Sequence, residues 1–305
     1  MEKLMPAQTR RRRPGRARDL VSRWSFIAPA GLVLAAVLAY PIFYALQISF
    51  STLDLTTFGP GEFVGFENYE DAFANENFIR SLGTTAIYLI LALPLQIILG
   101  FAIAFFLNAE WKGRGVVRAL FLIPMVIIPV VSGGTWKMLL DPLFGVVSWL
   151  LSLVGLPSPN WFGDPSWAML SIVIIDTWRS TPFVVLIAAA AILSLPKDIY
   201  EAAQVDGANW WRQLWSISLP LLTPIIAATF IVRWLGAVKM FDIVIATTRG
   251  GPGQSTNVVN LYIYQQAFQS LKFSESAAMA IIVLIITMIL TFAFLAVSHR
   301  LENRF

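Results

Sequence analysis

SLPKDIYEAAQVDGANWWRQLWSISLP, residues 194–220, is the stretch that decides the architecture, because it is a charged interruption between two long apolar segments. It contains five charged side chains: Lys197, Asp198, Glu201, Asp206 and Arg212. These lie too close together for the stretch to cross a bilayer, where each charge costs roughly 2.5–3.5 kcal/mol at mid-depth. The stretch therefore belongs at a membrane surface, and the apolar segments on either side of it are expected to cross the membrane.

Two short helices are predicted within this stretch. Pro196 suits a first helical turn, and Asp198 and Glu201 lie where the positive end of the helix dipole favours acids. Gly207 offers a stop or a sharp turn, after which apolar side chains resume at helical spacing: Trp211, Leu214 and Trp215. Two helices that meet near Gly207 would form a compact knob (residues 194–216), and such a shape is suited to docking.

The spacing within the knob resembles a known motif. The knob resembles the EAA loop of binding-protein-dependent ABC importer permeases, and every position of that motif is matched. The matching positions are Glu201-Ala202-Ala203, then Gly207 after three residues, Ile217 after nine more, and Leu219-Pro220 after one more. The resemblance implies coupling helices seated in a groove of a separate ATPase subunit, and it assigns six residues to that coupling: Glu201, Ala202, Ala203, Asp206, Gly207 and Pro220. The small alanines allow helices to approach closely, and Gly207 permits a bend. The alternative is a surface helix without a partner.

Composition indicates a polytopic membrane protein. The 305 residues are 57% hydrophobic and 13% charged, with a mean hydropathy of +0.70, which is too apolar for a soluble domain. The absence of cysteine excludes disulfides and thiolate metal sites. The arginine-rich start, Arg10 to Arg13, is typical of a nucleic-acid arm, a signal peptide or a cytosolic anchor. Because the uncharged run 24–53 that follows is much longer than a signal-peptide core, we interpret 1–23 as a cytosolic tail and expect no nucleic-acid partner.

The expected fold class is all-α, with six transmembrane helices in the type I ABC importer permease fold that the resemblance implies. The predicted spans are about 24–50, 81–107, 117–138, 167–194, 217–246 and 274–298. Together they make a permease domain over 24–298, followed by a tail, 299–305, that begins with an interfacial His299. Of the 22 Lys and Arg residues, 15 fall in the two tails, the 108–118 loop and the 194–216 loop, whereas 4 fall on the opposite side. Both termini and the knob are therefore expected in the cytoplasm of a prokaryotic cell, beneath its plasma membrane.

Two segments on the opposite, outer side are expected to be ordered. Residues 61–73 interleave aromatic and acidic side chains, which suits a short helix at the membrane surface. Residues 141–167 include an apolar stretch, 146–156, that is too short to span and suits the interface. Both resemble segments of sugar-type permeases. They are candidates either for contact with an outer partner or for simple interfacial packing.

Ionisable residues inside spans are costly and normally face a cavity, a partner or one another. Two pairs at i,i+3 spacing, Asp176 with Arg179 and Lys239 with Asp242, share a helix face and are candidates for pairing. Either they are internal ion pairs that hold the bundle together, or they line a polar path for a hydroxyl-rich solute. The candidate path comprises Asp176, Trp178, Arg179, Arg233, Trp234, Lys239 and Asp242, with Trp136 as a weaker stacking candidate and with hydroxyls from Thr177, Ser180 and Thr181.

A second resemblance covers 241–268, FDIVIATTRGGPGQSTNVVNLYIYQQAF. It is similar to the signature of the carbohydrate and glycerol-3-phosphate branch of the same permeases, and with the EAA loop the likeness extends over nearly the whole chain from about residue 24. Arg249 departs from the pattern, in which small or polar residues are commoner, and it favours an anionic solute or an acidic partner surface.

These observations predict a transport subunit rather than an enzyme. The chain has no Gly-x-x-x-x-Gly-Lys-Ser/Thr loop, so no cofactor is expected in it, and ATP and Mg²⁺ are expected on a partner. The resemblance implies a second permease chain, usually a different one, an ATPase dimer, an extracytoplasmic solute-binding protein and a carbohydrate substrate. The alternatives are a permease for glycerol-3-phosphate, polyols or amino acids, an ion-coupled secondary transporter, and a membrane scaffold that transports nothing.

Overall fold

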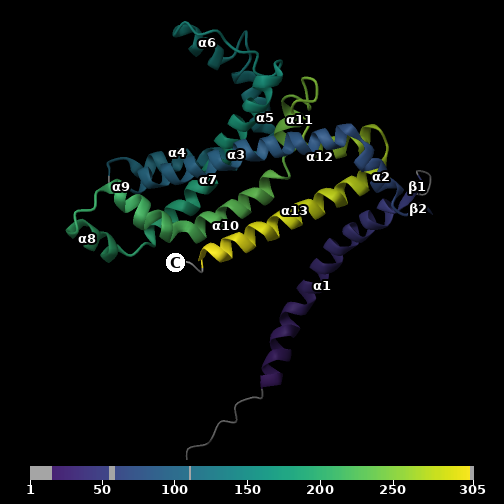
Figure 1. Ribbon diagram of the computed structural model, residues 1–305, viewed down its shortest axis with the longest axis horizontal. Coiled ribbons are helices and arrows are strands. Elements are labelled where there is room, and N and C mark those ends of the chain that lie inside the picture. The colour runs from purple at the N-terminus through teal and green to yellow at the C-terminus, as the bar shows by residue number, and fades with distance from the viewer. Residues whose placement is uncertain (1–15, 55–58, 110, 303–305) are drawn as a thin grey trace, which may run out of the picture.

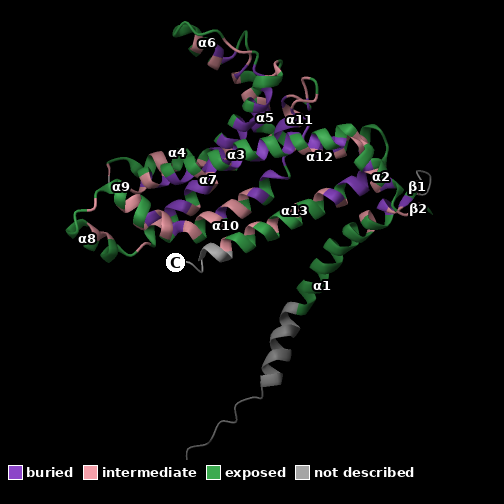
Figure 2. Ribbon diagram, in the orientation of Figure 1, coloured by how far each residue is buried: buried purple, intermediate pink, exposed green. Residues whose placement is uncertain are grey.

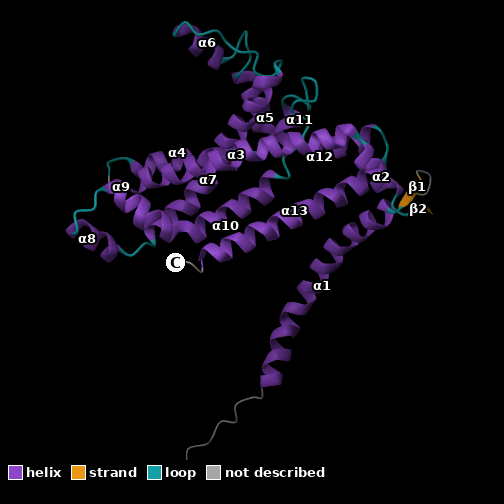
Figure 3. Ribbon diagram, in the orientation of Figure 1, coloured by secondary structure: helices purple, strands orange, loops and turns teal. Residues whose placement is uncertain are grey.

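The computed structural model describes residues 16–54, 59–109 and 111–302, and within this part the chain is mostly helical (Figure 3). Five helices are long and apolar enough to cross a membrane, or six if one bent pair forms a single span. The five contain the spans 28–49, 76–108, 165–193, 210–237 and 273–298. The type of fold and the approximate positions of these five spans agree with the sequence-based prediction.

Helices α3 (Glu76–Asn108), α7 (Pro165–Leu193), α10 (Leu219–Ala237) and α13 (Phe273–Glu302) run lengthwise beside one another (Figure 1). Helix α3 packs tightly against α7 at Gly100, which has no side chain and lies directly against Val184 of α7. Buried apolar side chains from these helices, such as Phe101, Leu107 and Leu222, fill the seam between them. Burial in Figure 2 is accordingly concentrated in α3 and α7.

The first helix, α1 (Arg16–Ser49), leaves this bundle at an angle (Figure 1). It begins inside the predicted cytosolic tail, of which residues 1–15 lie outside the described part. Pro29 and Pro41 lie within it, but it continues as one helix through both. Only 6% of its apolar span is buried in this chain, so most of its side chains face surroundings other than the chain itself.

The predicted third span, 117–138, is not one straight helix. It consists of α4 (Arg114–Val126) and α5 (Pro129–Leu139), which meet at 105°. Pro129 begins α5, and a residue before proline is disfavoured in the helical region; Ile128 accordingly has φ −59° and ψ 135°. The predicted span runs through Pro129 without a break, and in this respect the prediction was wrong.

The predicted fifth span, 217–246, is also divided. Helix α9 (Trp210–Gln213) continues through a π-helical turn, η1 (Leu214–Ser218), into α10, which ends at Ala237. After four residues without regular structure, α11 (Asp242–Ala246) forms a separate short helix. The expected end of the span at 246 was therefore wrong by about nine residues.

Apart from α6, the remaining elements lie at the two ends of the bundle (Figure 1). At one end are α2 (Glu67–Ala74) and a hairpin of β1 (Ser51–Asp54) and β2 (Gly59–Phe63), an antiparallel pair that the sequence did not predict. Near this end, α12 (Val259–Tyr264) and a second π-turn, η2 (Gln265–Gln269), precede α13. At the other end is α8 (Lys197–Val205), together with α9. Helix α6 (Val146–Leu153) projects beyond α5.

Candidate functional site

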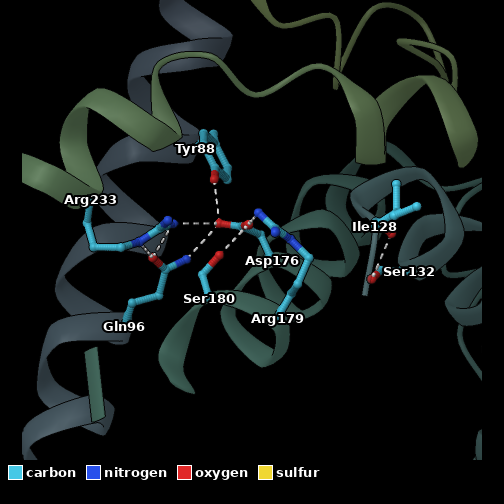
Figure 4. A network of polar contacts seen from close by, with 8 residues as sticks. All are labelled: Tyr88, Gln96, Ile128, Ser132, Asp176, Arg179, Ser180 and Arg233. Atoms are coloured by element: carbon cyan, nitrogen blue, oxygen red, sulfur yellow. Dashed lines mark hydrogen bonds and ion pairs between the residues drawn. The ribbon is translucent and has the colours of Figure 1, made fainter. Parts of the chain in front are cut away.

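Asp176, on α7, is the centre of a polar network in the middle of the bundle (Figure 4). Its side chain is almost fully buried, with 4% of its surface exposed. Its Oδ2 accepts hydrogen bonds from the Tyr88 hydroxyl at 2.7 Å and the Gln96 amide at 2.8 Å. Its Oδ1 accepts one from the Ser180 hydroxyl at 2.9 Å. These three donors satisfy the carboxylate oxygens in a place without contact with bulk water.

Two arginines complete the network. Nη2 of Arg233, on α10, lies 3.3 Å from Asp176 Oδ2, and Nη2 of Arg179 lies 3.5 Å from Oδ1. Arg233 also donates two hydrogen bonds to Gln96 Oε1, at 3.0 and 2.8 Å. Gln96 thus accepts from the arginine and donates to the carboxylate, and α3, α7 and α10 are tied together at one depth.

The network lies where two of the divided spans change direction. Pro129, at the start of α5, and residues 239–243, at the start of α11, line one cavity together with Asp176, Arg179 and Arg233. The backbone groups released by these breaks find partners: Asn260 Nδ2 donates to the Val238 carbonyl at 2.6 Å. Non-helical backbone at membrane depth is tolerated where it is buried in protein or lines a water-filled cavity.

The cavity is small and mainly cationic. Its volume is about 150 Å³, and its charged lining consists of Arg179, Arg233, Lys239, Asp176 and Asp242. Three cations thus face two carboxylates. The Nε of Arg179 is buried without a hydrogen-bond partner among the described residues. The site can therefore donate hydrogen bonds to a hydroxyl-rich or negatively charged group that enters from the cavity.

The structure brings some of the predicted path residues together and separates others. The predicted Asp176–Arg179 ion pair is confirmed. The predicted Lys239–Asp242 pair is wrong: both residues line the cavity, but the structure contains no ion pair between them, because the helix that would have aligned them ends at Ala237.

The aromatic candidates lie beside the cavity rather than around it. Trp178 and Trp136 contact each other edge to face, with ring centroids 5.6 Å apart. Trp234 turns toward α13, where its indole donates to the Thr291 hydroxyl at 3.1 Å. None of these three rings lines the 150 Å³ cavity. Thr177 and Thr181 line a neighbouring surface pocket with Trp178, and their hydroxyls are buried without partners in the described chain.

Tyr88 and Gln96 are the members of the network that the sequence did not reveal. Both side chains are fully buried. Neither side chain carries a charge in the sequence-based pattern of ionisable residues within spans, so that pattern does not indicate them. One signal was available for Gln96: it is the sole polar side chain between Leu89 and Leu107, a run that is otherwise apolar.

The knob at the end of the bundle has the predicted form. Helix α8 and helix α9 are separated by Gly207, whose φ of +76° only glycine adopts readily. Glu201, Ala202, Asp206 and Gly207 are exposed, and α8 contributes no residue to the core. A helix without a buried face is not held in place by hydrophobic packing within this chain.

Exposed apolar side chains lie on the same knob. Val205 is 88% exposed, and three tryptophans, Trp210, Trp211 and Trp215, are each more than half exposed. Trp210 and Trp211 contact each other edge to face at 4.7 Å. Apolar patches of this kind, rimmed by charges, mark surfaces for a protein partner or a membrane.

At the opposite side, two charged residues outside the spans are fixed locally. The backbone N–H groups of Phe144 and Leu143 donate to Asp141 and lower the pKa of its carboxyl. Two hydrogen bonds to Glu275, at 2.9 and 3.1 Å, together with its negative charge, raise the pKa of Lys272. Both groups remain charged at neutral pH.

Comparison with protein families places most of the chain within one of them. Residues 72–305 match the model described as "Binding-protein-dependent transport system inner membrane component". The matched region includes the knob and all of α7 and α10.

Curated relatives cover nearly the whole chain. The trehalose/maltose transport system permease protein MalF of Thermococcus litoralis is 33% identical over 90% of this chain and 92% of its own length. The sulfoquinovosyl glycerol transport system permease protein SmoG of Agrobacterium fabrum is 31% identical, with 89% and 88% covered. The trehalose transport system permease protein SugA of Mycobacterium tuberculosis is 30% identical, with 88% and 86% covered.

Among solved structures, a chain of a bacterial ABC transporter involved in the import of the acidic polysaccharide alginate has the same fold. Its TM-score is 0.79 at 24% identity, and the match covers 94% of this chain and 99% of that one.

Proposed function

The chain belongs to the family of inner membrane components of binding-protein-dependent transport systems, and it is the permease subunit of an ABC importer rather than an enzyme; we propose that its solute is a sugar. Three curated relatives at 30–33% identity are named for the transport of trehalose, maltose or a sulfoquinovosyl glycerol. The 241–268 segment, which resembles the carbohydrate branch, supports the same substrate class.

The observation that carries this proposal is the polar cavity in the middle of an otherwise apolar bundle. Asp176, Arg233 and Gln96 are held in fixed positions beside it. Hydrogen-bond donors and acceptors at a break in the spanning helices are suited to the hydroxyls of a sugar. The cavity is about 150 Å³ and is bounded by one chain. We therefore regard it as half of a pathway, completed by a second permease subunit.

A second permease chain would also account for α1. This helix is long enough to span the membrane, but only 6% of its apolar window is buried in this chain. We propose a pair of different permease chains, with an ATPase dimer below and a solute-binding protein above. ATP and Mg²⁺ would bind the ATPase; no cofactor is proposed for this chain.

In this assembly the knob and both termini face the cytoplasm. ATP-driven closure of the ATPase dimer would push on Glu201, Ala202, Ala203 and Asp206, and would move the knob, with Gly207 keeping its two helices at the required angle. The spans would then change from inward-open to outward-open, and the binding protein would release solute to the Asp176 cavity. Pro220, at the start of α10, would mark the point where the motion enters the spans.

Two substitutions in the knob test this proposal. Glu201→Lys reverses an exposed charge, and Gly207→Pro imposes a φ near −65° where the backbone has +76°. Both should abolish ATP-driven solute uptake while the protein stays in the membrane, because neither residue is buried. Lys112→Glu, a charge reversal on another exposed loop, is the matched control and should retain uptake. Normal uptake by both knob variants would refute the proposed coupling.

The charge of the cavity supports a second candidate solute. Because three cations face two carboxylates, a solute with a phosphate, sulfonate or carboxylate group would fit as well as a neutral sugar. A ligand screen of the solute-binding protein that works with this chain would separate these classes. Uptake by the purified chain in liposomes without ATP would instead indicate an ion-coupled transporter.

A further inference from the structure

Helix α8 is weakly connected to the rest of the chain. No residue of α8 is buried. A cavity of about 340 Å³ separates it from the ends of α3 and α7; this cavity is lined by Phe105 and Leu193 from those helices, by Lys197 and Tyr200 from α8, and by Trp210 from α9. A force applied to α8 can therefore reach the spans by only a few routes.

The covalent route from α8 to α10 passes through Gly207 and α9, and a side chain at Gly207 would meet nothing within 4 Å. Two backbone hydrogen bonds hold the turn, from Gly207 N–H to the Gln204 carbonyl at 3.0 Å and from Ala208 N–H to the Ala203 carbonyl at 2.9 Å. A push on α8 that reached α10 only along the backbone would therefore bend the chain at this hinge, which no side-chain packing at Gly207 supports.

One hydrogen bond bypasses the hinge. The Tyr200 hydroxyl lies 2.8 Å from the hydroxyl of Ser218, across the cavity. Because the Ser218 hydroxyl donates to the Gln213 carbonyl at 3.3 Å, Tyr200 is the donor to Ser218. Gln213 in turn donates from Nε2 to the Ala208 carbonyl at 2.8 Å, next to the hinge. Among the described residues, no other side chain of α8 has a hydrogen bond to another element.

Ser218 is placed where a displacement enters a spanning helix. It is the last residue of the π-turn η1 and is buried, with 4% of its surface exposed. Helix α10 follows immediately and carries Arg233, fifteen residues further on. At a rise of about 1.5 Å per residue, the two positions are about 22 Å apart along the helix. The path from the knob to Asp176 thus consists of one hydrogen bond, one helix and one ion pair.

We propose that the Tyr200–Ser218 hydrogen bond is the rigid link through which α8 moves α10, and that Tyr200 and Ser218 are positioning residues for coupling. The inference rests on the proposed docking of an ATPase at the knob. While the bond is intact, the knob and α10 move as one body; when it is absent, α8 is joined to α10 only through the turn at Gly207 and α9.

The test follows α8 and α10 directly, with ATP and Mg²⁺ as the probe, so it does not depend on knowing the solute. The chain has no cysteine, so spin labels can be placed at Asp198→Cys on α8 and Leu221→Cys on α10, both exposed. In the assembled importer, the distribution of distances between the two labels should stay narrow and keep its mean when ATP is added. In Tyr200→Phe, which removes only the hydroxyl, ATP should move α8 without α10. The population with an altered distance should then rise roughly twofold to tenfold, as expected for one lost hydrogen bond.

Further variants separate a link from a general structural role. Ser218→Ala should reproduce Tyr200→Phe, and the double variant should be no worse than either single variant, since both remove the same bond. Ser218→Thr keeps the hydroxyl, has room for its methyl at the cavity, and should restore the narrow distribution. Ser216→Ala, an exposed serine in the same π-turn, should behave as the unsubstituted protein.

The outcomes are distinguishable. A distance distribution in Tyr200→Phe that equals that of the unsubstituted protein would overturn the link. Additive effects of Tyr200→Phe and Ser218→Ala in the double variant would also overturn it. So would loss of the ATPase from the purified Tyr200→Phe variant. If no ATPase co-purifies with the unsubstituted protein, the proposed function fails, and the link fails with it.

Discussion

The Asp176 network and the knob are built in opposite ways. At Asp176, three helices converge on one buried carboxylate, and each polar group that meets it is held by at least one partner. At the knob, charged and aromatic side chains are exposed, α8 has no core contacts, and a glycine divides the two helices. The first region is specified by this chain alone, whereas packing within this chain does not fix the position of α8 in the second. Under the proposed function, the Asp176 network would be the fixed part of the pathway, and the knob would be the movable part on which the ATPase acts.

The sharpest way to break this contrast is to remove the central charge. Asp176→Asn leaves Arg233 and Arg179 without the carboxylate that balances them, and breaking a buried pair from one side costs about 3–5 kcal/mol. We expect a large loss of thermal stability for the purified chain and little protein in the membrane. The matched control is Asp242→Asn, a carboxylate on the same cavity that is exposed and has no ion pair in the described chain. Equal stability of the two variants would show that the network is not structural.

The sequence predicted the helices better than it predicted where they break. Long apolar runs identified the spans, and Gly207 with its flanking charges correctly indicated two helices at the knob. Proline position alone did not distinguish Pro94, which lies inside α3, from Pro129, which begins a new helix at 105°. That choice depends on whether neighbouring elements satisfy the released backbone groups, and such contacts are not visible in a linear sequence.

Only part of the candidate site was predicted, because contacts between residues far apart in the sequence are not visible in it. Asp176 and Arg179 are three residues apart on one helix, so their pairing follows from local spacing. Arg233 reaches Asp176 from 57 residues away, and Gln96 does so from 80, and only the packing of α3, α7 and α10 brings them together. The assignment of knob residues to ATPase contact remains a prediction.

A smaller effect is expected where the interior is tightly packed but uncharged. A methyl group at Gly100 would overlap Val184 of α7, so Gly100→Ala should destabilise the chain by about 1–3 kcal/mol, measured by thermal unfolding in detergent. Gly83→Ala, on the same helix, has nothing within 4 Å and should be neutral or slightly stabilising. Combining Gly100→Ala with Val184→Ala should recover part of the loss. No difference between Gly100→Ala and Gly83→Ala would mean that α3 and α7 are more loosely packed than the structure indicates.

The smallest effect on the stability of the chain itself is expected at the knob. A substitution there tests whether an exposed residue of the knob serves a partner rather than the fold of this chain. Val205 is 88% exposed at the end of α8, so Val205→Ser removes an apolar surface that this chain does not bury. The unfolding temperature of the isolated chain should hardly change, since exposed substitutions usually shift stability by less than about 0.5 kcal/mol. If a partner covers this side chain, the same substitution should reduce the amount of ATPase that co-purifies with the chain, because the lost apolar contact then lies in an interface. A fall in unfolding temperature without loss of the ATPase would contradict this division, because Val205 would then stabilise its own chain and not the complex.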